Sequence, residues 1–240
     1  MGRAFEVRKA AMAKTGAAKT KVYSRFGKEI YVAAKSGVPD PEMNLTLKRT
    51  IEKAKAAQVP ADIIKRAIEK AKGGSEESYT SVRYEGFGPN NSFIIVDCLT
   101  DNVNRTVSDV RTCFNKSKSK MGISGSVAHN FDHVGVLSFA FDDDGAMLDA
   151  LVEANVDVQD IEVEDGQMTV YVAPTDLYAA KGAVEALIPN VNFDVVENTM
   201  IPQSYVTVEG EDKELFDRLM SMLDAVDDVQ EVYHNVQDNA

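Results

Sequence analysis

The spacing of the apolar residues changes once along this chain, at the Gly73-Gly74 pair. Before this pair, apolar side chains recur at about 3.6 residues, which is the repeat of an amphipathic helix. After it, stretches such as 79–84 and 92–99 alternate with a period of about two residues, as strands do. The segment GGSEES (73–78) is therefore predicted to link an all-helical N-terminal part to a mixed α/β remainder.

The N-terminal part is predicted to hold a bundle of short helices. One covers residues 4–14, and the next runs from Lys19 to Lys35. Two proline-containing breaks follow, at 37–41 and 59–60, and Asp40 is expected to cap the helix after the first break. The last helix of the bundle ends at the glycine pair.

The order of elements in the remainder predicts its topology. Residues 134–200 follow the order β-α-β-β-α-β, the ferredoxin-like split pattern. Two β-α-β units, at 92–131 and 204–236, would complete a second such pattern around it. We therefore predict an α+β fold with a helical bundle (1–74) and two ferredoxin-like α/β domains, in which 133–202 is inserted into a discontinuous domain made of 79–132 plus 203–240. The alternative is that the final hairpin pairs with 134–200.

Charge is distributed unevenly along the chain, whose formal net charge is -12. Residues 1–72 hold 17 Lys and Arg against 7 Asp and Glu, whereas residues 129–240 hold 3 against 25. This asymmetry is the pattern expected of a basic contact surface carried on an acidic body. The acidic residues are expected to point away from a polyanion or to dock a basic protein, so a protein-interaction module is the rival class of function.

The motifs of common nucleotide-binding and hydrolytic enzymes are missing. Neither the phosphate loop GxxxxGK[ST] nor the dinucleotide motif GxGxxG occurs. Gly86-Phe87-Gly88 is only a fragment of the second motif and is interpreted as a hairpin turn. The sequence GISGS (122–126) departs from the nucleophile elbow GxSxG at its last position. We expect no enzymatic activity and no catalytic residue.

No metal or cofactor is expected either. His129 and His133 are four residues apart, which suits a metal on a helix but spans about 13 Å in the extended chain expected here. The run Asp142 to Gly145 resembles the start of a calcium loop, but Ala146 and Met147 fall where acceptor and glycine are required. A strand-to-helix turn with a capping Asp is the favoured interpretation.

The two cysteines, Cys98 and Cys113, lie in apolar contexts and are expected to be buried small hydrophobes rather than a disulfide or a nucleophile. The sequence has no apolar run of membrane-spanning length, and its first residues are not expected to act as a secretory signal, because no apolar segment follows the positive charges. We expect a cytoplasmic protein.

A nucleic acid is the predicted partner of the basic part. Lys and Arg on helical faces neutralise phosphates and release counterions, whereas the alternatives are an ordinary solvated helix surface or an anionic membrane. Contacts to the backbone are favoured over base reading, because the helices offer only Asn44 and a few hydroxyls for bases. The predicted contacts are Arg3, Arg8, Lys9, Lys14, Lys19, Lys21, Arg25, Lys28, Lys35, Lys48 and Arg49.

Several longer stretches closely resemble one family. RYEGFGP (83–89), CLTDNVNRTVSDVR (98–111), GSVAHNF (125–131) and NLTLKRTIEKAKAAQVPADIIKRAIEKAKGG (44–74) are similar to the YebC/PmpR family. YVAAKSGVPDPEMN (31–44) and DVQEVYHNV (228–236) resemble its YeeN subgroup. The resemblance covers essentially the whole chain.

This resemblance implies a bacterial protein of three domains, a basic helical bundle and two α/β domains with one inserted in the other, without known enzymatic activity. The family carries the label of probable transcriptional regulatory protein with DNA binding. A mitochondrial relative is a translational activator, and ribosome association is attributed to bacterial members, so promoter DNA and ribosomal RNA both stay open as targets. Many relatives begin with a segment containing Ser-Lys-Trp, whereas this chain has Phe5 and no tryptophan.

Arg105, in the family-like triplet NRT (104–106), is the last predicted contact. It either touches a ligand or is a solvent-side residue in the first turn of a helix that Asn102 caps.

Overall fold

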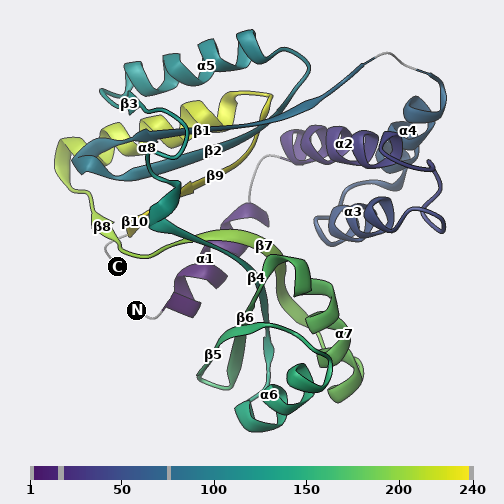
Figure 1. Ribbon diagram of the computed structural model, residues 1–240. Helices are drawn as coiled ribbons and strands as arrows, with labels where there is room; N and C mark the ends of the chain where they lie inside the picture. The colour runs from purple at the N-terminus through teal and green to yellow at the C-terminus, as the bar shows by residue number, and fades with distance from the viewer. Residues whose placement is uncertain (1–2, 16–18, 75–76, 238–240) are drawn as a thin grey trace. The chain divides into compact units, whose positions relative to one another are not determined.

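The computed structural model describes residues 3–15, 19–74 and 77–237 of the chain (Figure 1). It divides into two compact units. Unit 1 comprises residues 1–16 and 130–203, and unit 2 comprises residues 17–129 and 204–240. The predicted α+β class, with one α/β domain inserted in another, is confirmed.

Unit 1 contains the predicted β-α-β-β-α-β order. Its elements are β4 (Phe131–Ala140), α6 (Asp144–Glu153), β5 (Val158–Glu164), β6 (Gln167–Val172), α7 (Leu177–Leu187) and β7 (Phe193–Pro202). The strands pair in the order β5-β6-β4-β7 with every neighbour antiparallel, which is the ferredoxin-like arrangement. Asp143 caps α6 by accepting a hydrogen bond from Ala146 N at 2.9 Å, as the favoured interpretation of the DDDG run predicted.

The sheet of unit 1 is apolar on both faces. Helices α6 and α7 pack on one face around Phe139, Met168 and Val170. On the other face a cluster of β4, β6 and β7 residues includes Tyr171, and helix α1 (Arg3–Thr15) contributes Val7 to it. Helix α1 was predicted to belong to the helical bundle (1–74). In the structure it packs on this sheet, because the second apolar face needs cover and the buried Ala4 and Val7 supply it.

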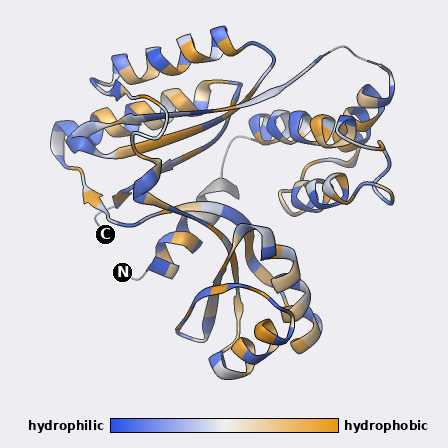
Figure 2. Ribbon diagram, in the orientation of Figure 1, coloured by the Kyte–Doolittle hydropathy of each residue, from blue (hydrophilic) through white to orange (hydrophobic). Residues whose placement is uncertain are grey.

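The helical part of unit 2 consists of α2 (Lys19–Lys35), α3 (Leu45–Ala56) and α4 (Ala61–Lys72). Figure 2 shows how hydrophobic and hydrophilic residues alternate around the turns of these helices. Their shared core includes Ile30, Leu47 and Ile64. The predicted cap at Asp40 was wrong. Asn44 caps α3 through Leu47 N, and its side-chain amide also donates to two carbonyls before α3, of Ala33 at 2.8 Å and Val38 at 3.0 Å.

The sheet of unit 2 joins chain segments from both sides of the insertion. Its strands are β1 (Thr80–Phe87), β2 (Phe93–Thr100), the short β3 (Lys120–Met121) and β9 (Val229–His234), in the order β3-β1-β2-β9. Because β9 pairs antiparallel with β2, the alternative pairing of the final hairpin with 134–200 is excluded. Two further short strands, β8 (Val206–Thr207) and β10 (Val236–Gln237), form a separate parallel pair.

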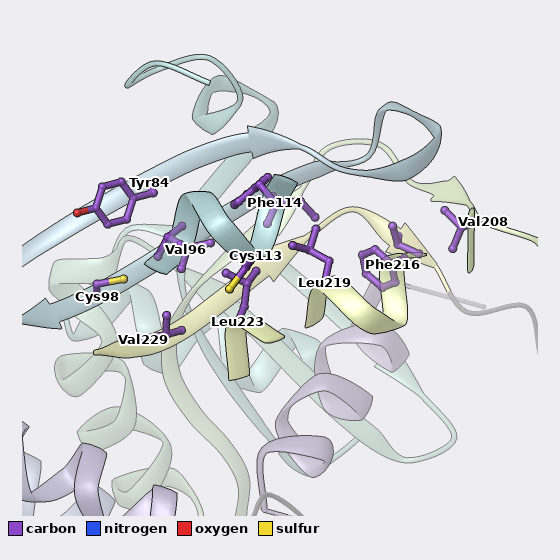
Figure 3. Packing of buried hydrophobic residues seen from close by; sticks show 13 residues of the cluster. Tyr84, Val96, Cys98, Cys113, Phe114, Val208, Phe216, Leu219, Leu223 and Val229 are labelled. Atoms are coloured by element: carbon purple, nitrogen blue, oxygen red, sulfur yellow. The ribbon is translucent and has the colours of Figure 1, made fainter. Parts of the chain in front are cut away.

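Helices α5 (Val103–Lys116) and α8 (Gly210–Ala225) cover this sheet. Their buried residues, such as Phe114 and Leu219, pack with Val96 of β2 (Figure 3). Cys98 and Cys113 belong to this core and are free thiols, as predicted. Burial raises the pKa of Cys98 to about 12, which makes it a poor nucleophile.

The β-α-β unit predicted at 92–131 was expected to end in a strand at 126–131, which does not form before Phe131. Residues 128–130 make a 3-10 turn instead. The physical reason is the buried carboxylate of Glu85, which accepts hydrogen bonds from the backbone N–H groups of Gly125, Val127 and Ala128 at 2.7–2.8 Å. These donors are therefore not available to a sheet ladder.

Candidate nucleic-acid interface

The cations of α1 lie against acidic strand β5 of their own unit. The guanidinium of Arg3 is 3.6 Å from the Asp160 carboxylate and sits over the Tyr171 ring at 4.2 Å. Arg8 is 3.4 Å from Glu164. Lys9 is half-buried, and the side chain of Lys14 lies outside the described residues. Arg3 and Arg8 would have to leave these carboxylates in order to bind phosphate.

Three cations of α2, Lys21, Arg25 and Lys28, are bonded to the end of α8, the start of β9 and the residues between them. Lys21 and Arg25 both contact the carboxylate of Asp224, at 3.0 and 2.9 Å. Arg25 also donates to the Val229 carbonyl at 2.9 Å, which fixes its guanidinium on the start of β9. Burial by itself would raise the pKa of Asp224, but the hydrogen bonds and positive charges of these two cations outweigh it and hold the pKa below its ordinary value. The acidic residues were expected to point away from a polyanion or to dock a basic protein, whereas Asp224 binds the basic helix of its own chain.

Asp228 is the centre of the most buried of these contacts. Its side chain is 5% exposed and accepts hydrogen bonds from Lys28 at 2.9 Å and Arg105 at 2.7 Å. The hydroxyls of Thr100 and Thr106 donate to the same carboxylate, at 3.1 and 2.9 Å. Burial alone would raise the pKa of this carboxyl, but these donors outweigh it and lower the pKa to about 2. Asp228 is therefore an ionised anchor that ties α2 to α5 and β2.

The NRT triplet has a structural explanation in this network. Asn102 caps α5 by accepting from Arg105 N at 3.1 Å, and the Arg105 guanidinium bridges Asp101 and Asp228, each at 2.7 Å. An open hollow of about 750 Å³ adjoins the network and is lined by further carboxylates, those of Asp101, Asp109 and Asp227. Lys28 and Arg105 also line the hollow, but both already bind these or neighbouring carboxylates, so in this structure Arg105 serves as an ion-pair residue.

Helices α3 and α4 carry cations of a different kind. The sequence KRTIEKAK at 48–55 recurs as KRAIEKAK at 65–72, with one difference in eight positions. We call these two stretches the repeated octets. In both, the apolar positions face the bundle core and the cations face outward. The exposed cations of the repeated octets are Lys48, Lys53, Lys55, Lys65, Arg66, Lys70 and Lys72.

The ion pairs that the cations of the repeated octets form are exposed to solvent. Arg66 bonds Asp62 one turn earlier, Lys72 bonds Glu69 at 3.1 Å, and Lys48 lies 3.5 Å from Glu42. Pairs of this kind contribute about 0–1 kcal/mol each, so a phosphate can replace the carboxylate at little cost. Beside them, a hollow of about 320 Å³ between α2 and α4 is lined by Arg66 and Lys70 together with Tyr31 and Tyr79. The repeated octets therefore form an electropositive surface that the rest of unit 2 leaves open.

The structure separates predicted contacts that are bonded to carboxylates of their own unit, described above, from predicted contacts on α2 and α3 that are more open to solvent. Lys48 and the half-buried Arg49 belong to the repeated octets, and Lys19 and Lys35 are exposed on α2, although Lys35 donates to the Tyr31 hydroxyl at 3.0 Å. The predicted set did not include Lys53, Lys55 and the cations of α4, which are exposed on the two helices of the repeated octets. The sequence signal for these cations is the repetition of the octet. Each of the two helices buries its apolar residues in the same core and therefore carries its cations on the opposite, outer side.

Within residues 3–9, 19–74 and 77–237, no group of three or more His, Cys, Asp or Glu side chains could hold a metal ion. His129, one of the two histidines considered for a metal, instead contacts the Gly125 carbonyl through Nδ1 at 3.2 Å. In the described part of the chain, no helix combines the length and apolarity needed to cross a membrane.

Comparison with known proteins gives matches along the whole chain. The family profile described as TACO1/YebC protein N-terminal domain matches residues 3–74, and the profile of the TACO1/YebC second and third domain matches residues 79–236. A relative from Pseudoalteromonas translucida is 56% identical over 236 residues, 98% of each chain, and one from Alteromonas mediterranea is 54% identical over 235 residues, again 98% of each. Both are named probable transcriptional regulatory proteins. A solved structure of a conserved hypothetical protein from Aquifex aeolicus is 33% identical, covers 94% of this chain and 93% of its own, and superposes with a TM-score of 0.75.

Proposed function

This chain belongs to the TACO1/YebC family, and from that premise we propose that it is a non-enzymatic regulator of gene expression that binds nucleic acid in the cytoplasm. Its relatives' name, probable transcriptional regulatory protein, supports a nucleic-acid target. The contact surface is assigned to the cations of the repeated octets on α3 and α4.

The observation that carries this assignment is the outward exposure of the repeated octets. Residues 45–72 hold eight Lys and Arg against three Asp and Glu, and seven of these cations are exposed. Each cation that approaches a backbone phosphate releases condensed counterions, which makes association favourable and dependent on salt. The surface thus supplies affinity for a polyanion without any further change of conformation.

The mode of binding is contact with the backbone rather than reading of bases. Asn44, the one amide that could have reached a base from the start of α3, is buried and caps the helix. The exposed positions of the repeated octets are occupied by Lys, Arg and Glu, which position a protein on phosphates but read little sequence. We therefore expect weak discrimination among sequences of the same shape.

Fluorescence anisotropy with a labelled DNA duplex and a labelled structured RNA, measured between about 50 and 200 mM salt, tests the proposal. The affinity is expected to fall steeply as salt rises, with a logarithmic slope of about -0.9 per phosphate contacted on duplex DNA. A flat response, or no binding at the lowest salt concentration, would refute the proposed function.

Promoter DNA and ribosomal RNA remain the two candidate targets, because charge alone does not separate them. Sedimentation of a cell lysate through a sucrose gradient distinguishes these targets. Co-migration with a ribosomal subunit, abolished at high salt, supports the ribosome-associated alternative, a translation factor on ribosomal RNA. Migration of the protein away from the ribosomal fractions supports DNA as the target.

One observation favours a protein partner as a second candidate. Helix α6 exposes Leu148 (45%) and Val152 (60%) one turn apart, flanked by the exposed Asp149 and Glu153. An acidic rim around apolar residues fits a basic amphipathic helix. Titration calorimetry with a synthetic Lys/Leu amphipathic peptide tests it. Loss of binding on Val152→Asp supports this surface, and unchanged binding excludes it.

A further inference from the structure

A second basic stretch lies in unit 2, outside the helical bundle. Residues 110–131 contain Arg111, Lys116, Lys118 and Lys120 but no Asp or Glu, although the chain as a whole is acidic. All four side chains are exposed at the end of α5 and on β3. Lys118 bonds Glu211 at 2.6 Å, but both side chains are about 70% exposed, so the pair contributes little and exchanges readily.

The loop that follows β3 is held in one conformation. The Glu85 residue is 4% exposed, and its carboxylate accepts three backbone hydrogen bonds from the loop and the turn after it. Gly122 N donates to the Glu85 carbonyl at 2.8 Å, and Ser126 N closes a turn on the Ile123 carbonyl at 3.1 Å. Gly125 adopts φ +82°, which favours glycine. The loop 122–126 is therefore preorganised rather than loose.

The attachment of this loop to the sheet is equally tight. A Cβ at Gly86 of β1 would lie 2.7 Å from the Lys120 carbonyl and would also collide with the Phe114 ring. Glycine at this position lets the edge strand β3 approach β1 closely, so the base of the loop rests on the core of unit 2.

Ile123 is displayed at the tip of this loop. It is 81% exposed, more than any other large apolar side chain among the described residues. A single exposed apolar residue is ordinary on a protein surface. Here, however, a buried carboxylate holds the loop at Gly125 and Val127. Small residues flank Ile123 in the chain, and Lys120 lies on the strand before it. This combination presents an apolar wedge next to phosphate-binding groups.

We propose that the loop 122–126 is a second nucleic-acid contact of unit 2, in which Ile123 packs against or between bases while Lys116 and Lys120 bind the flanking phosphates. The inference rests on the proposed function and extends it from the repeated octets to the edge of the sheet. Apolar side chains of this size insert between base steps in other nucleic-acid-binding proteins, where neighbouring cations hold the backbone. DNA and RNA share this chemistry of stacked bases, so both are used as probes.

A tryptophan reporter tests the wedge directly. The chain has no tryptophan, so Ile123→Trp introduces a single fluorophore at the loop tip. Stacking on bases is expected to quench its emission when duplex DNA or structured RNA is added, and to shield it from iodide. Leu148→Trp on α6, 45% exposed at the native residue, is the matched control and is expected to change little.

The reporter separates the loop contact from the proposed function. If nucleic acid binds by anisotropy but the Ile123→Trp variant responds no more than the control, the loop contact is overturned and the proposed function stands. Failure of the wild-type chain to bind either probe overturns the proposed function itself. If the emission of the Ile123→Trp variant shifts with protein concentration alone, the loop packs against a second copy of the chain, and the inference fails.

Substitutions separate the wedge from the cations. Ile123→Ser should weaken binding several-fold at every salt concentration and leave the salt slope unchanged, because isoleucine carries no charge. The double variant Lys116→Gln/Lys120→Gln should reduce the slope on duplex DNA by about 1.8, at about 0.9 for each phosphate that is no longer neutralised. Unchanged affinity and slope in both variants, with circular dichroism spectra matching the wild type, would refute the assignment.

Discussion

Helix α2 and the pair α3–α4 belong to one bundle and carry five and eight Lys and Arg, yet their cations have different surroundings. On α2, the side chains of Lys21, Arg25 and Lys28 are only 16–19% exposed and bind carboxylates near the start of β9. The seven exposed cations of the repeated octets face solvent. Basic composition therefore does not identify a contact surface; what matters is which carboxylates the fold brings near each cation.

The two sets of ion pairs also differ in strength. Lys28 and Arg105 share Asp228 with two hydroxyls, so a carboxylate that is only 5% exposed has four donors. Removing one member of such a set leaves charges unpaired and is strongly destabilising. The pairs of α4 are exposed and contribute little, whether they join two residues of the helix or reach beyond it, as Lys70 and Glu77 do. We infer that α2 stabilises unit 2 and that α3–α4 bind the partner.

Neutralising the repeated octets is expected to give the largest effect. The variant with Lys53, Lys55, Lys70 and Lys72 changed to Gln should lower the salt slope on duplex DNA by about 3.6, at about 0.9 for each phosphate that is no longer neutralised. Anisotropy across a salt series measures it. The control changes two exposed cations of α8, Lys213 and Arg218, to Gln and should leave the slope unchanged. Equal slopes in wild type and octet variant would place the contact elsewhere.

Removing the anchor of α2 is expected to give the largest change in stability. Asp228→Ala leaves Lys28 and Arg105 without their shared carboxylate and should lower the free energy of unfolding by about 3 kcal/mol. Urea denaturation followed by circular dichroism measures this change. Asp227→Ala, at the exposed neighbouring position, is the matched control and should cost much less. If both variants unfold at the same urea concentration, α2 is not held by this network.

Acidification should weaken the same anchor. The pKa of Asp228 is about 2 in the folded chain against an ordinary value of 3.8, so the unfolded state binds more protons between these values. Stability from this group is present above about pH 4 and decreases as pH falls toward 2, by about 2 kcal/mol in total. The difference in unfolding free energy between wild type and Asp228→Asn should therefore shrink over this range. A constant difference would contradict the depressed pKa.

Removing an exposed ion pair at the edge of the repeated octets should have the smallest effect on stability and binding. Glu42→Gln removes the carboxylate 3.5 Å from Lys48, where both side chains are exposed. Stability should change by less than about 0.5 kcal/mol, since exposed pairs contribute little. Affinity for duplex DNA at low salt should rise slightly because Lys48 then has one fewer competitor. A fall in affinity would show that Glu42 positions Lys48 for binding.

The ion pairs of α2 decide which charge-reversal variants are informative. Reversing Lys21 and Arg25 would place acidic side chains beside Asp224 and destabilise unit 2. Weaker nucleic-acid binding in such a variant would report unfolding as readily as the removal of a phosphate contact. Substitutions in the repeated octets avoid this ambiguity, because the exposed side chains there can change without disturbing the core.

The order of helices and strands followed from the sequence because the apolar period is local information. The stripes of α2 to α4 and the β-α-β-β-α-β order of 134–200 were predicted, and the structure contains them. Burial of Cys98 and Cys113 followed from the apolar residues around them. The strand expected at 126–131 was wrong, because a distant carboxylate, that of Glu85, bonds its backbone.

The sequence by itself determined where the positive charge lies and which segments can bury an apolar face. Only the tertiary structure decided which of those charges are open to a partner. Asp224 and Asp228 are about 200 residues away from the cations of α2 that they bind. No local pattern links them, because the pairing of β9 with β2 and the packing of α8 bring them to α2. Coulomb attraction depends on distance in space, and the fold sets that distance.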